Sequence, residues 1–590
     1  MQYDPANPLI VQSDRTILLD THAAAADKAR AALIPFAELE RSPEHLHTYR
    51  LTPLSIWNAS SAGFSPEHIS DTLERFSRYP IPPVIPAWIR ETAGRFGKLR
   101  IIYRDENLYL VTAVLPIFRE IEASKGMSGY LRPEPSITGQ DGTELYVFAL
   151  PLIYRGVVKQ ELLKLGWPVW DEAPLVPGDP LELALLEERR SGGPFIIRDY
   201  QRNAAEALVG DMRPGSGFGT IVLPCGAGKT IVGMYIMSLL KTNTLILTTN
   251  VSAVHQWMAE LLDKTTLTEE DIGEYTGESK NIKPVTVATY QVITWRPDKD
   301  SPFPHFQLFR ERAWGLIIYD EVHLLPAPVF RVTAELQAVR RVGLTATLVR
   351  EDGNEGYVFS LVGPKRFDVP WKDLELSGWI AAAECVEIRV DLAPDREIAY
   401  ATANLRQKHR IASENPAKTG IVTELVRMHP EDRILIIGQY LNQLEELAEL
   451  LSAPIITGKT PNSVRDGIYA SFRRGEIQTL VVSKVANFAI DLPDASMAIQ
   501  ISGTFGSRQE EAQRLGRILR PKERVSRFYT IVSRHTVEEE FAANRQKFLA
   551  EQGYAYRILH FHDIASLADA ASLADAASLA ETECLCRNEF

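Results

Sequence analysis

Cysteines, long apolar runs and excess positive charge are scarce or absent in this sequence of 590 residues. Its four cysteines are too few for a disulfide framework, which favours a reducing compartment. No run reaches the roughly 18 apolar residues of a membrane-spanning helix. The opening MQYDPANPLIVQSD lacks the basic and apolar segments of a secretory signal. We therefore expect a cytoplasmic protein without a membrane partner.

The net charge of −12 argues against a uniformly basic coating protein. A local basic groove on an acidic body can still neutralise phosphates, so the charge is compatible with a nucleic-acid partner.

Short apolar runs alternate with helical patterns from residue 195 onward. This alternation is typical of a parallel sheet covered by helices on both faces. It pauses near 380–415 and then resumes, so we expect an α/β protein with two parallel-sheet units of similar size. The runs are TIVLP, TLILTT, PVTVATY, GLIIYDE and RVGLTAT in the first unit, and RILIIGQ, APIITG, QTLVVSK, MAIQIS and RFYTIVS in the second.

The first third of the chain has a different texture. Residues 1–95 carry helical spacing, with Ser65 as a helix start. Residues 98–114 alternate as a hairpin would, and ELYVFAL (144–150) is another strand-like run. Residues 171–193 combine turn residues with charge and predict a linker.

The C-terminal tail contains the repeat SLADAASLADAASLA (566–580). Its leucines step by about 600° on an ideal helix, so they form no apolar stripe. This favours a marginal helix or a disordered segment over an ordered terminal helix. Cys584 and Cys586 lie beyond the repeat and are too few ligands for a metal site.

The stretch LPCGAGKT (223–230) nearly matches the phosphate-loop pattern, with Leu223 in place of the first glycine. A predicted strand precedes it and a predicted helix follows, which is the geometry that brings backbone N–H groups to phosphates. Gly226 and Gly228 would allow the turn. Lys229 would contact the β- and γ-phosphates, and Thr230 would place its hydroxyl on Mg²⁺. The alternative is a plain strand-to-helix turn.

A second element, LIIYDEVH (316–323), ends an apolar strand with two carboxylates. Asp320 suits Mg²⁺ coordination as the acidic partner of a phosphate loop. Glu321 could orient or deprotonate the attacking water. Taken alone, such a pair is also an ordinary helix-start signal.

A third element, EAQRLGRILR (511–520), places Gln513, Arg517 and Arg520 on one helix face and turns Arg514 away from it. A row of arginines is commonly a solvated face. On the second unit, these guanidinium groups could instead reach the γ-phosphate as arginine fingers.

Together these elements resemble superfamily 2 helicases. GLTATLVRED (343–352) adds Thr345-Ala-Thr347, which in that superfamily couples the ATP site to nucleic acid, followed by Arg350-Glu351-Asp352. That triplet, the Asp-Glu-Val-His box and LPCGAGK look like the XPB family of DNA repair and transcription helicases, in its bacterial and archaeal branch. The resemblance covers roughly residues 1–560.

The resemblance implies further site residues. Arg198 and Gln201 would match the adenine-contacting segment, although a helix start capped by Asp199 is the alternative. Asn250 would match the first DNA-contacting motif. Asp491 would help to sense ATP across the cleft between the two units.

The fold that the resemblance implies is α/β, with two RecA-like parallel-sheet domains in tandem after an N-terminal α/β accessory region. A short thumb-like insertion would lie near 385–415. The expected parts are 1–97, an N-terminal helicase-associated domain; 98–190, a damage-recognition-like domain and linker; 191–378, the ATP-binding helicase domain 1; 379–555, helicase domain 2; and 556–590, a low-complexity tail.

The implied activity is that of an ATP- and Mg²⁺-dependent 3′–5′ DNA helicase or double-stranded DNA translocase. It would act on duplex and single-stranded DNA in nucleotide excision repair, in the nucleoid of a bacterial or archaeal cell. Two alternatives stay open. An RNA-remodelling helicase shares every ATP-site residue, and an ATP-gated scaffold would recruit a structure-specific nuclease, the kind of partner associated with prokaryotic members of the family.

Overall fold

The computed structural model describes residues 4–560 except 34, 42–45, 140–141, 211–216, 225, 299–300, 302, 326–338, 347–354, 370, 484–494, 504–513, 516–517, 519–524, 552–553 and 555. It divides into two compact units, Met1–Trp371 and Lys372–Phe590. The repeat tail lies outside the described residues. Among those described, no helix combines the length and apolar character needed to cross a bilayer.

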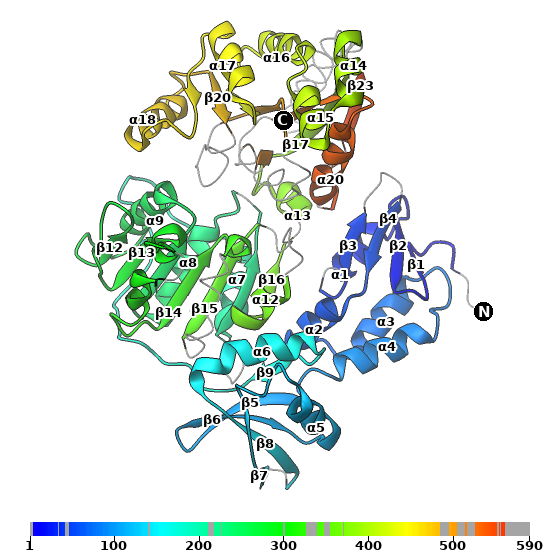
Figure 1. Cartoon of the computed structure of the whole chain (residues 1–590), viewed down its shortest axis with the longest axis vertical. Coiled ribbons are helices and arrows are strands. Elements are labelled where there is room, and N and C mark those ends of the chain that lie inside the picture. The colour runs from blue at the N-terminus through cyan, green and yellow to red at the C-terminus, as the bar shows by residue number, and fades with distance from the viewer. Residues whose placement is uncertain are drawn as a thin grey trace, which may run out of the picture. The chain divides into compact units, whose positions relative to one another are not determined.

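Each unit contains a seven-stranded parallel sheet among its described residues, and the two sheets have the same topology. The first of these sheets is drawn in green in Figure 1. Numbered by appearance within its own unit, each sheet has the strand order 3-4-2-5-6-1-7. The first sheet comprises β10 (Phe218–Val222), β11 (Thr244–Thr248), β12 (Ile272–Tyr275), β13 (Val285–Thr289), β14 (Leu316–Asp320), β15 (Arg340–Thr345) and β16 (Lys365–Asp368). The second comprises β17 (Ala383–Val390), β18 (Ile434–Gly438), β19 (Ile455–Ile456), β20 (Thr479–Ser483), β21 (Met497–Gln500), β22 (Ser526–Ser533) and β23 (Tyr556–His560). The predicted pair of RecA-like domains is confirmed.

The central strands form where the sequence has continuous apolar runs. All five residues of β10, β11 and β13 are buried, because helices cover both faces of a parallel sheet. The helices of the first unit's sheet are α7 (Asp199–Val209), α8 (Lys229–Leu240), α9 (Val251–Lys264), α10 (Tyr290–Ile293) and α12 (Glu355–Leu361), followed by α13 (Trp371–Leu376). Those of the second unit are α14 (Pro394–Thr402), α15 (Leu405–Ser413), α16 (Ala417–Met428), α17 (Leu441–Leu450), α18 (Asn462–Arg473) and α20 (Val537–Glu551).

The start of the predicted thumb-like insertion near 385–415 overlaps a strand of the second sheet. Residues 383–390 form β17, which pairs in parallel with β22 and β23 inside the second sheet. Helix α15 is anchored to the same domain, since Ala412 O accepts a hydrogen bond from Ser533 Oγ at 2.7 Å. None of the residues of α14 is buried. The charged residues of AECVEIRV interrupt the apolar run that is typical of a buried strand. The strands that pair with this segment lie far along the chain, so the sequence alone did not predict it.

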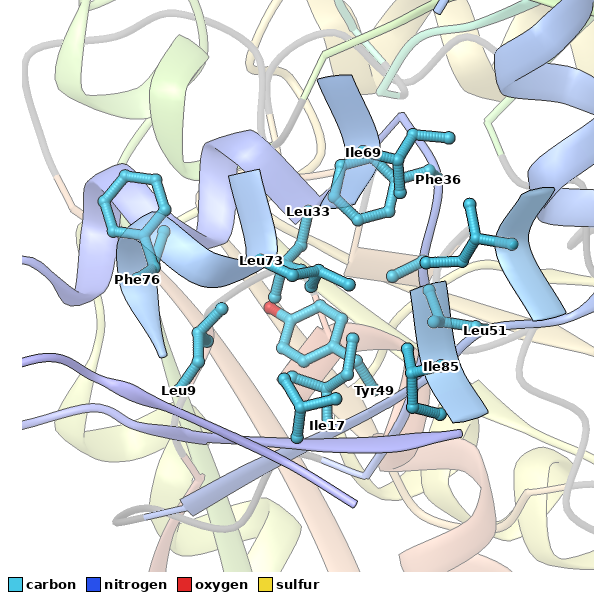
Figure 2. Packing of buried hydrophobic residues seen from close by; sticks show 14 of the residues in the cluster. Leu9, Ile17, Leu33, Phe36, Tyr49, Leu51, Ile69, Leu73, Phe76 and Ile85 are labelled. Carbon is cyan, nitrogen blue, oxygen red and sulfur yellow. The ribbon is translucent and has the colours of Figure 1, made fainter. Parts of the chain in front are cut away.

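The N-terminal region also differs from its predicted helical character. Four antiparallel strands stand in the order β1 (Leu9–Val11), β2 (Thr16–Asp20), β4 (Leu46–Arg50) and β3 (Glu38–Arg41). The helices α1 (Ala26–Leu33), α2 (Pro53–Ser61), α3 (Pro66–Phe76) and α4 (Val84–Ala93) accompany them. Figure 2 shows Ile17 and Tyr49 of the strands in one core with Leu33 and Leu73 of the helices. The predicted start at Ser65 is confirmed, because its side chain accepts from His68 N.

A five-stranded sheet follows, in the order β7 (Arg132–Thr138), β8 (Glu144–Leu150), β6 (Asn107–Thr112), β5 (Leu99–Arg104) and β9 (Val169–Asp171). Helices α5 (Leu115–Ala123) and α6 (Arg155–Lys164) belong to this region. The predicted hairpin is confirmed. Its turn residues Asp105 and Glu106 have φ of 49° and 63°, as a type I′ turn requires.

The segment predicted as a linker is fastened to the first RecA-like domain. Asp179 N donates to Ala313 O, and Leu181 N donates to Lys241 O, both at 2.9 Å. Further on, Leu186 N donates to Lys264 O at 2.9 Å. These hydrogen bonds hold the segment against the surface of the domain along its length.

Candidate nucleotide site

The glycine-rich loop lies between β10 and α8, as predicted. Gly226 and Gly228 have φ of +80° and +82°, a region that residues with a side chain rarely adopt. Leu223, at the position of the usual first glycine, is fully buried, and its N–H donates to Thr345 O at 2.9 Å. The leucine therefore fills the core at the loop entrance, where no glycine conformation is needed.

The segment before the loop supports it from one side. Gln201 Nε2 and Tyr200 Oη both donate to Ala227 O, at 2.9 and 2.7 Å. Gln201 Oε1 accepts from Arg198 N at 3.0 Å, and Arg198 Nη1 donates to Tyr200 Oη at 3.1 Å. Helix α7 begins at Asp199, so the alternative in which that residue caps the helix is wrong by one position. Gln201 is buried against the loop and sets its conformation.

The two carboxylates of the acidic element reach the same place. Asp320 ends β14, and Glu321 follows with φ of 50° and ψ of 54°. Lys229 Nζ lies 3.2 Å from Glu321 Oε1. A 3₁₀ turn, Val322–Leu324, follows Glu321, whose side chain makes no hydrogen bond that caps this turn. The loop lysine and the acidic pair therefore form one cluster at the carboxyl edge of the sheet.

Asp320 is held by a residue that the sequence analysis did not single out. Its Oδ2 accepts a hydrogen bond from Trp257 Nε1 at 2.9 Å, and its Oδ1 accepts from Glu321 N at 3.1 Å. Burial raises the pKa of Asp320 to about 6, and the charge of Glu321 adds to this; the Trp257 hydrogen bond and the charge of Lys229 oppose it. A nearby cation stabilises the ionised form of a buried carboxylate whose pKa is raised.

Thr230 lies in the first turn of α8. Its hydroxyl and the Asp320 carboxylate are hard oxygen donors of the kind that Mg²⁺ prefers, so these two residues would hold the ion if it is bound with a nucleotide. Among the described residues, no cluster of three or more His, Cys, Asp or Glu could hold a metal without such a ligand.

A histidine extends the cluster toward the Thr-Ala-Thr element. His323 Nδ1 lies 2.6 Å from Thr345 Oγ1 and 3.5 Å from Glu321 Oε2. The imidazole is buried, so Lys229, Glu321, His323 and Thr345 form a continuous polar chain through the domain. His323 stands in the acidic element itself, three residues after Asp320, and that position was the signal that could have identified it.

Of the other predicted residues, Asn250 and Arg514 are described and the rest lie outside the described residues. Asn250 caps α9, since its Oδ1 accepts from Ala253 N at 2.9 Å. Arg514 is buried and donates to Gln500 Oε1 at 2.6 Å. The predicted site residues outside the described part are Thr347, Arg350, Glu351, Asp352, Asp491, Gln513, Arg517 and Arg520.

Three family models match the chain. They are "ERCC3/RAD25/XPB C-terminal helicase" over residues 374–584, "Type III restriction enzyme, res subunit" over 194–350, and "Helicase conserved C-terminal domain" over 9–134. The last match lies in the N-terminal part of this chain.

Whole-length relatives also match. The chain is 51% identical to a protein of Kineococcus radiotolerans named "DNA 3'-5' helicase XPB", over 94% of this chain and 97% of that protein. It is 50% identical to a Mycobacterium tuberculosis protein of the same name, over 94% and 98% of the two chains. A "Putative DNA 3'-5' helicase Rad25" of Halobacterium salinarum is 36% identical over 80% of this chain and 74% of that protein. With identity of one half over nearly the full length of two such proteins, the chain belongs to the XPB family of helicases.

Proposed function

We propose that this protein is an ATP-dependent 3′–5′ DNA helicase or double-stranded DNA translocase that acts in DNA repair. The contact between Lys229 and Glu321 carries the proposal, because it brings the phosphate loop and the acidic pair together at one edge of the sheet. The polarity and the DNA substrate rest on the names of the bacterial relatives. The repair role rests on more distant relatives named as subunits of a general transcription and DNA repair factor.

Each residue of the cluster then has a role. The N–H groups of the glycine loop and Lys229 would bind the β- and γ-phosphates. Thr230 and Asp320 would hold Mg²⁺, which neutralises the charge that develops on the phosphates. Glu321 would orient the attacking water and accept its proton. In the free protein its contact with Lys229 keeps both charged side chains near the place where the phosphate would bind.

The second domain would complete the reaction. Arg517 and Arg520, with Gln513 on the same predicted face, would stabilise the γ-phosphate, and Asp491 would help to sense the nucleotide. Arg198 would contact the adenine, with Gln201 holding the loop. We assign DNA contact and coupling to Asn250, Thr345, Thr347, Arg350, Glu351 and Asp352. A movement of the Glu321 side chain would shift His323 and, through it, Thr345, because the His323 ring lies near both residues.

The bound DNA would be held mainly through its phosphates, so affinity should fall steeply with salt. Nucleoid association and recruitment of a structure-specific nuclease are parts of the same proposal, and they rest on the family resemblance alone.

ATP hydrolysis measured with duplex DNA, single-stranded DNA and RNA tests the proposal, together with strand displacement from 3′ and 5′ overhangs. We expect stimulation by DNA and displacement in the 3′–5′ direction. Lys229→Ala should abolish hydrolysis, whereas Glu321→Gln should bind ATP and fail to turn it over. Stimulation by RNA alone would favour the RNA-remodelling alternative. Repair in cells that survives Glu321→Gln would favour the nuclease scaffold.

A further inference from the structure

A cavity of about 420 Å³ lies inside the first unit, where the N-terminal domain, the five-stranded sheet and the first RecA-like domain meet. We call it the junction cavity. Its lining includes Ser61 of α2, Lys159 of α6, Trp170 of β9, Phe218 of β10 and Arg366 of β16. A cavity of this volume is in the range of small-ligand pockets.

The junction cavity is separate from the candidate ATP site. Phe218 begins β10, and the glycine loop follows the other end of the same strand. Four steps of about 3.3 Å along the strand put roughly 13 Å between the two edges of the sheet. A ligand at the amino edge would therefore not occupy the phosphate loop.

Two cations and one carboxylate meet at one wall of the cavity. Asp171 Oδ1 accepts from Arg155 Nη2 at 2.7 Å, and Asp171 Oδ2 accepts from Lys159 Nζ at 3.0 Å. All three side chains are at least nine-tenths buried. One carboxylate thus already serves two cations.

Lys159 and two further cations lie around the aromatic ring of Phe218. The Arg341 and Arg366 guanidinium carbons lie 4.8 and 5.8 Å from the centre of the Phe218 ring, and Lys159 Nζ lies 5.9 Å from it. Burial lowers the pKa of Lys159 to about 7; the charge of Asp171 opposes this shift, and the charges of Arg341 and Arg155 add to it. The crowding of like charges in a poorly hydrated place would be relieved by an anion.

Two of these cations, Lys159 and Arg366, line the cavity itself, and so does the Asp171 carboxylate, which is paired with Arg155 and Lys159. Arg366 is already oriented, because its Nε donates to Phe218 O and its Nη1 donates to Ser61 O, both at 3.1 Å. At another part of the lining, Trp170 is 39% exposed and stacks on Phe96, with ring centroids 6.1 Å apart and planes at 23°. The cavity therefore offers cations for a phosphate and a flat aromatic surface for a base.

We propose that the junction cavity binds a nucleoside phosphate, with the phosphate on Lys159 and Arg366 and the base against Trp170. Charge-assisted hydrogen bonds to phosphate and stacking on an aromatic ring are the two interactions that such a ligand needs. A free mononucleotide and the terminal nucleotide of a DNA strand share this chemistry.

Calorimetric titration of the full-length chain with thymidine monophosphate tests the proposal. Lys229→Ala is the background, so that the ATP site does not contribute. We expect binding in this background and at least a tenfold weaker affinity after Arg366→Gln. Arg366→Lys, which keeps the charge, should retain part of the affinity. Arg119→Gln, at an arginine 66% exposed on α5, is the matched control and should change nothing.

No binding at millimolar ligand in the Lys229→Ala chain would overturn the proposal, and so would unchanged affinity after Arg366→Gln. If Arg366→Gln lowers the melting temperature, Lys159→Met provides the same comparison at the second cation. Inorganic phosphate that binds as tightly as the nucleotide would refute the role of Trp170. A 5′-phosphorylated oligonucleotide that displaces the nucleotide identifies a strand end as the ligand, and one that does not identifies a free mononucleotide. None of these measurements depends on ATP hydrolysis, so their failure would leave the helicase proposal intact.

Discussion

Trp257 donates its indole N–H to Oδ2 of Asp320 at 2.9 Å, across 63 positions of sequence. The indole is buried, and it packs so closely on α8 that a Cβ built at Gly233 would come within 2.6 Å of the ring. Trp257 belongs to the helix that Asn250 caps, and Gly233 to the helix that starts at Lys229. One side chain therefore joins the helix of the predicted DNA-contacting motif to the proposed metal carboxylate.

Trp257→Phe keeps most of the packing and removes the hydrogen bond. We expect the maximal rate of ATP hydrolysis to fall about tenfold, on the order of 1.4 kcal/mol in activation free energy, because Asp320 loses its orientation. The Mg²⁺ concentration for half-maximal activity should rise. Steady-state kinetics over a Mg²⁺ titration provide the measurement. Loss of stability alone would leave this midpoint unchanged, and that result would contradict a positioning role.

Asp320→Asn should stabilise the protein when it is free of metal and nucleotide. The pKa of Asp320 is raised from 3.8 to about 6, so the ionised carboxylate is less favourable in the folded chain than in the unfolded one. This penalty is complete above about pH 6, and it disappears as the pH falls through 6 to below 3.8. At pH 7.5 the gain should be on the order of 1–3 kcal/mol. Thermal melting in chelator should show a clearly larger rise in melting temperature at pH 7.5 than at pH 4; an equal shift at both would refute the assignment.

Gly228→Ala should abolish nucleotide binding. The new methyl group would meet Gln201 Nε2 at 2.5 Å in a backbone conformation with φ of +82°. The strain, roughly 1–3 kcal/mol, would distort the loop. Gly420→Ala in α16 is the matched control, because nothing lies within 4 Å of its added Cβ and alanine favours a helix. Fluorescent-nucleotide binding should be lost in the first variant and kept in the second.

Lys418→Met should destabilise the second unit. Lys418 Nζ donates to both carboxylate oxygens of Glu538 at 2.8 Å, and both side chains are almost completely buried. Removal of the cation leaves a buried charge, at a cost of roughly 3–5 kcal/mol. Lys164→Met breaks an ion pair in which the lysine is 53% exposed, and should cost less than about 1 kcal/mol. Chemical denaturation of both variants provides the comparison; equal losses would contradict the burial argument.

Arg517→Ala should stop ATP turnover and leave DNA binding nearly intact. An arginine finger acts on the γ-phosphate in the transition state, and its removal costs roughly 10³–10⁵ in rate. Single-turnover hydrolysis and DNA-binding isotherms separate the two effects. A defect in DNA binding alone would show that this residue contacts the DNA backbone instead.

The sequence by itself predicted the elements that depend on neighbours along the chain. Apolar runs such as TLILT and LIIYD announced central strands, because both faces of such a strand are buried. Gly226 and Gly228 before Lys229 announced the loop, since only glycine adopts these φ angles readily. The proposed role of Glu321 followed from its place in an acidic pair at the end of an apolar strand. Family resemblance supplied the remaining roles.

Only the tertiary structure decided which distant side chains meet. The charged segment β17 is a strand because it pairs with β22 on one side and β23 on the other, and both lie far from it in sequence. Tryptophan in an amphipathic helix is ordinarily a core residue, and nothing in its spacing shows that Trp257 reaches Asp320. The cations around Phe218 likewise come from three separate segments. Local periodicity records which face of an element is buried, whereas the partner on that face is set by long-range packing.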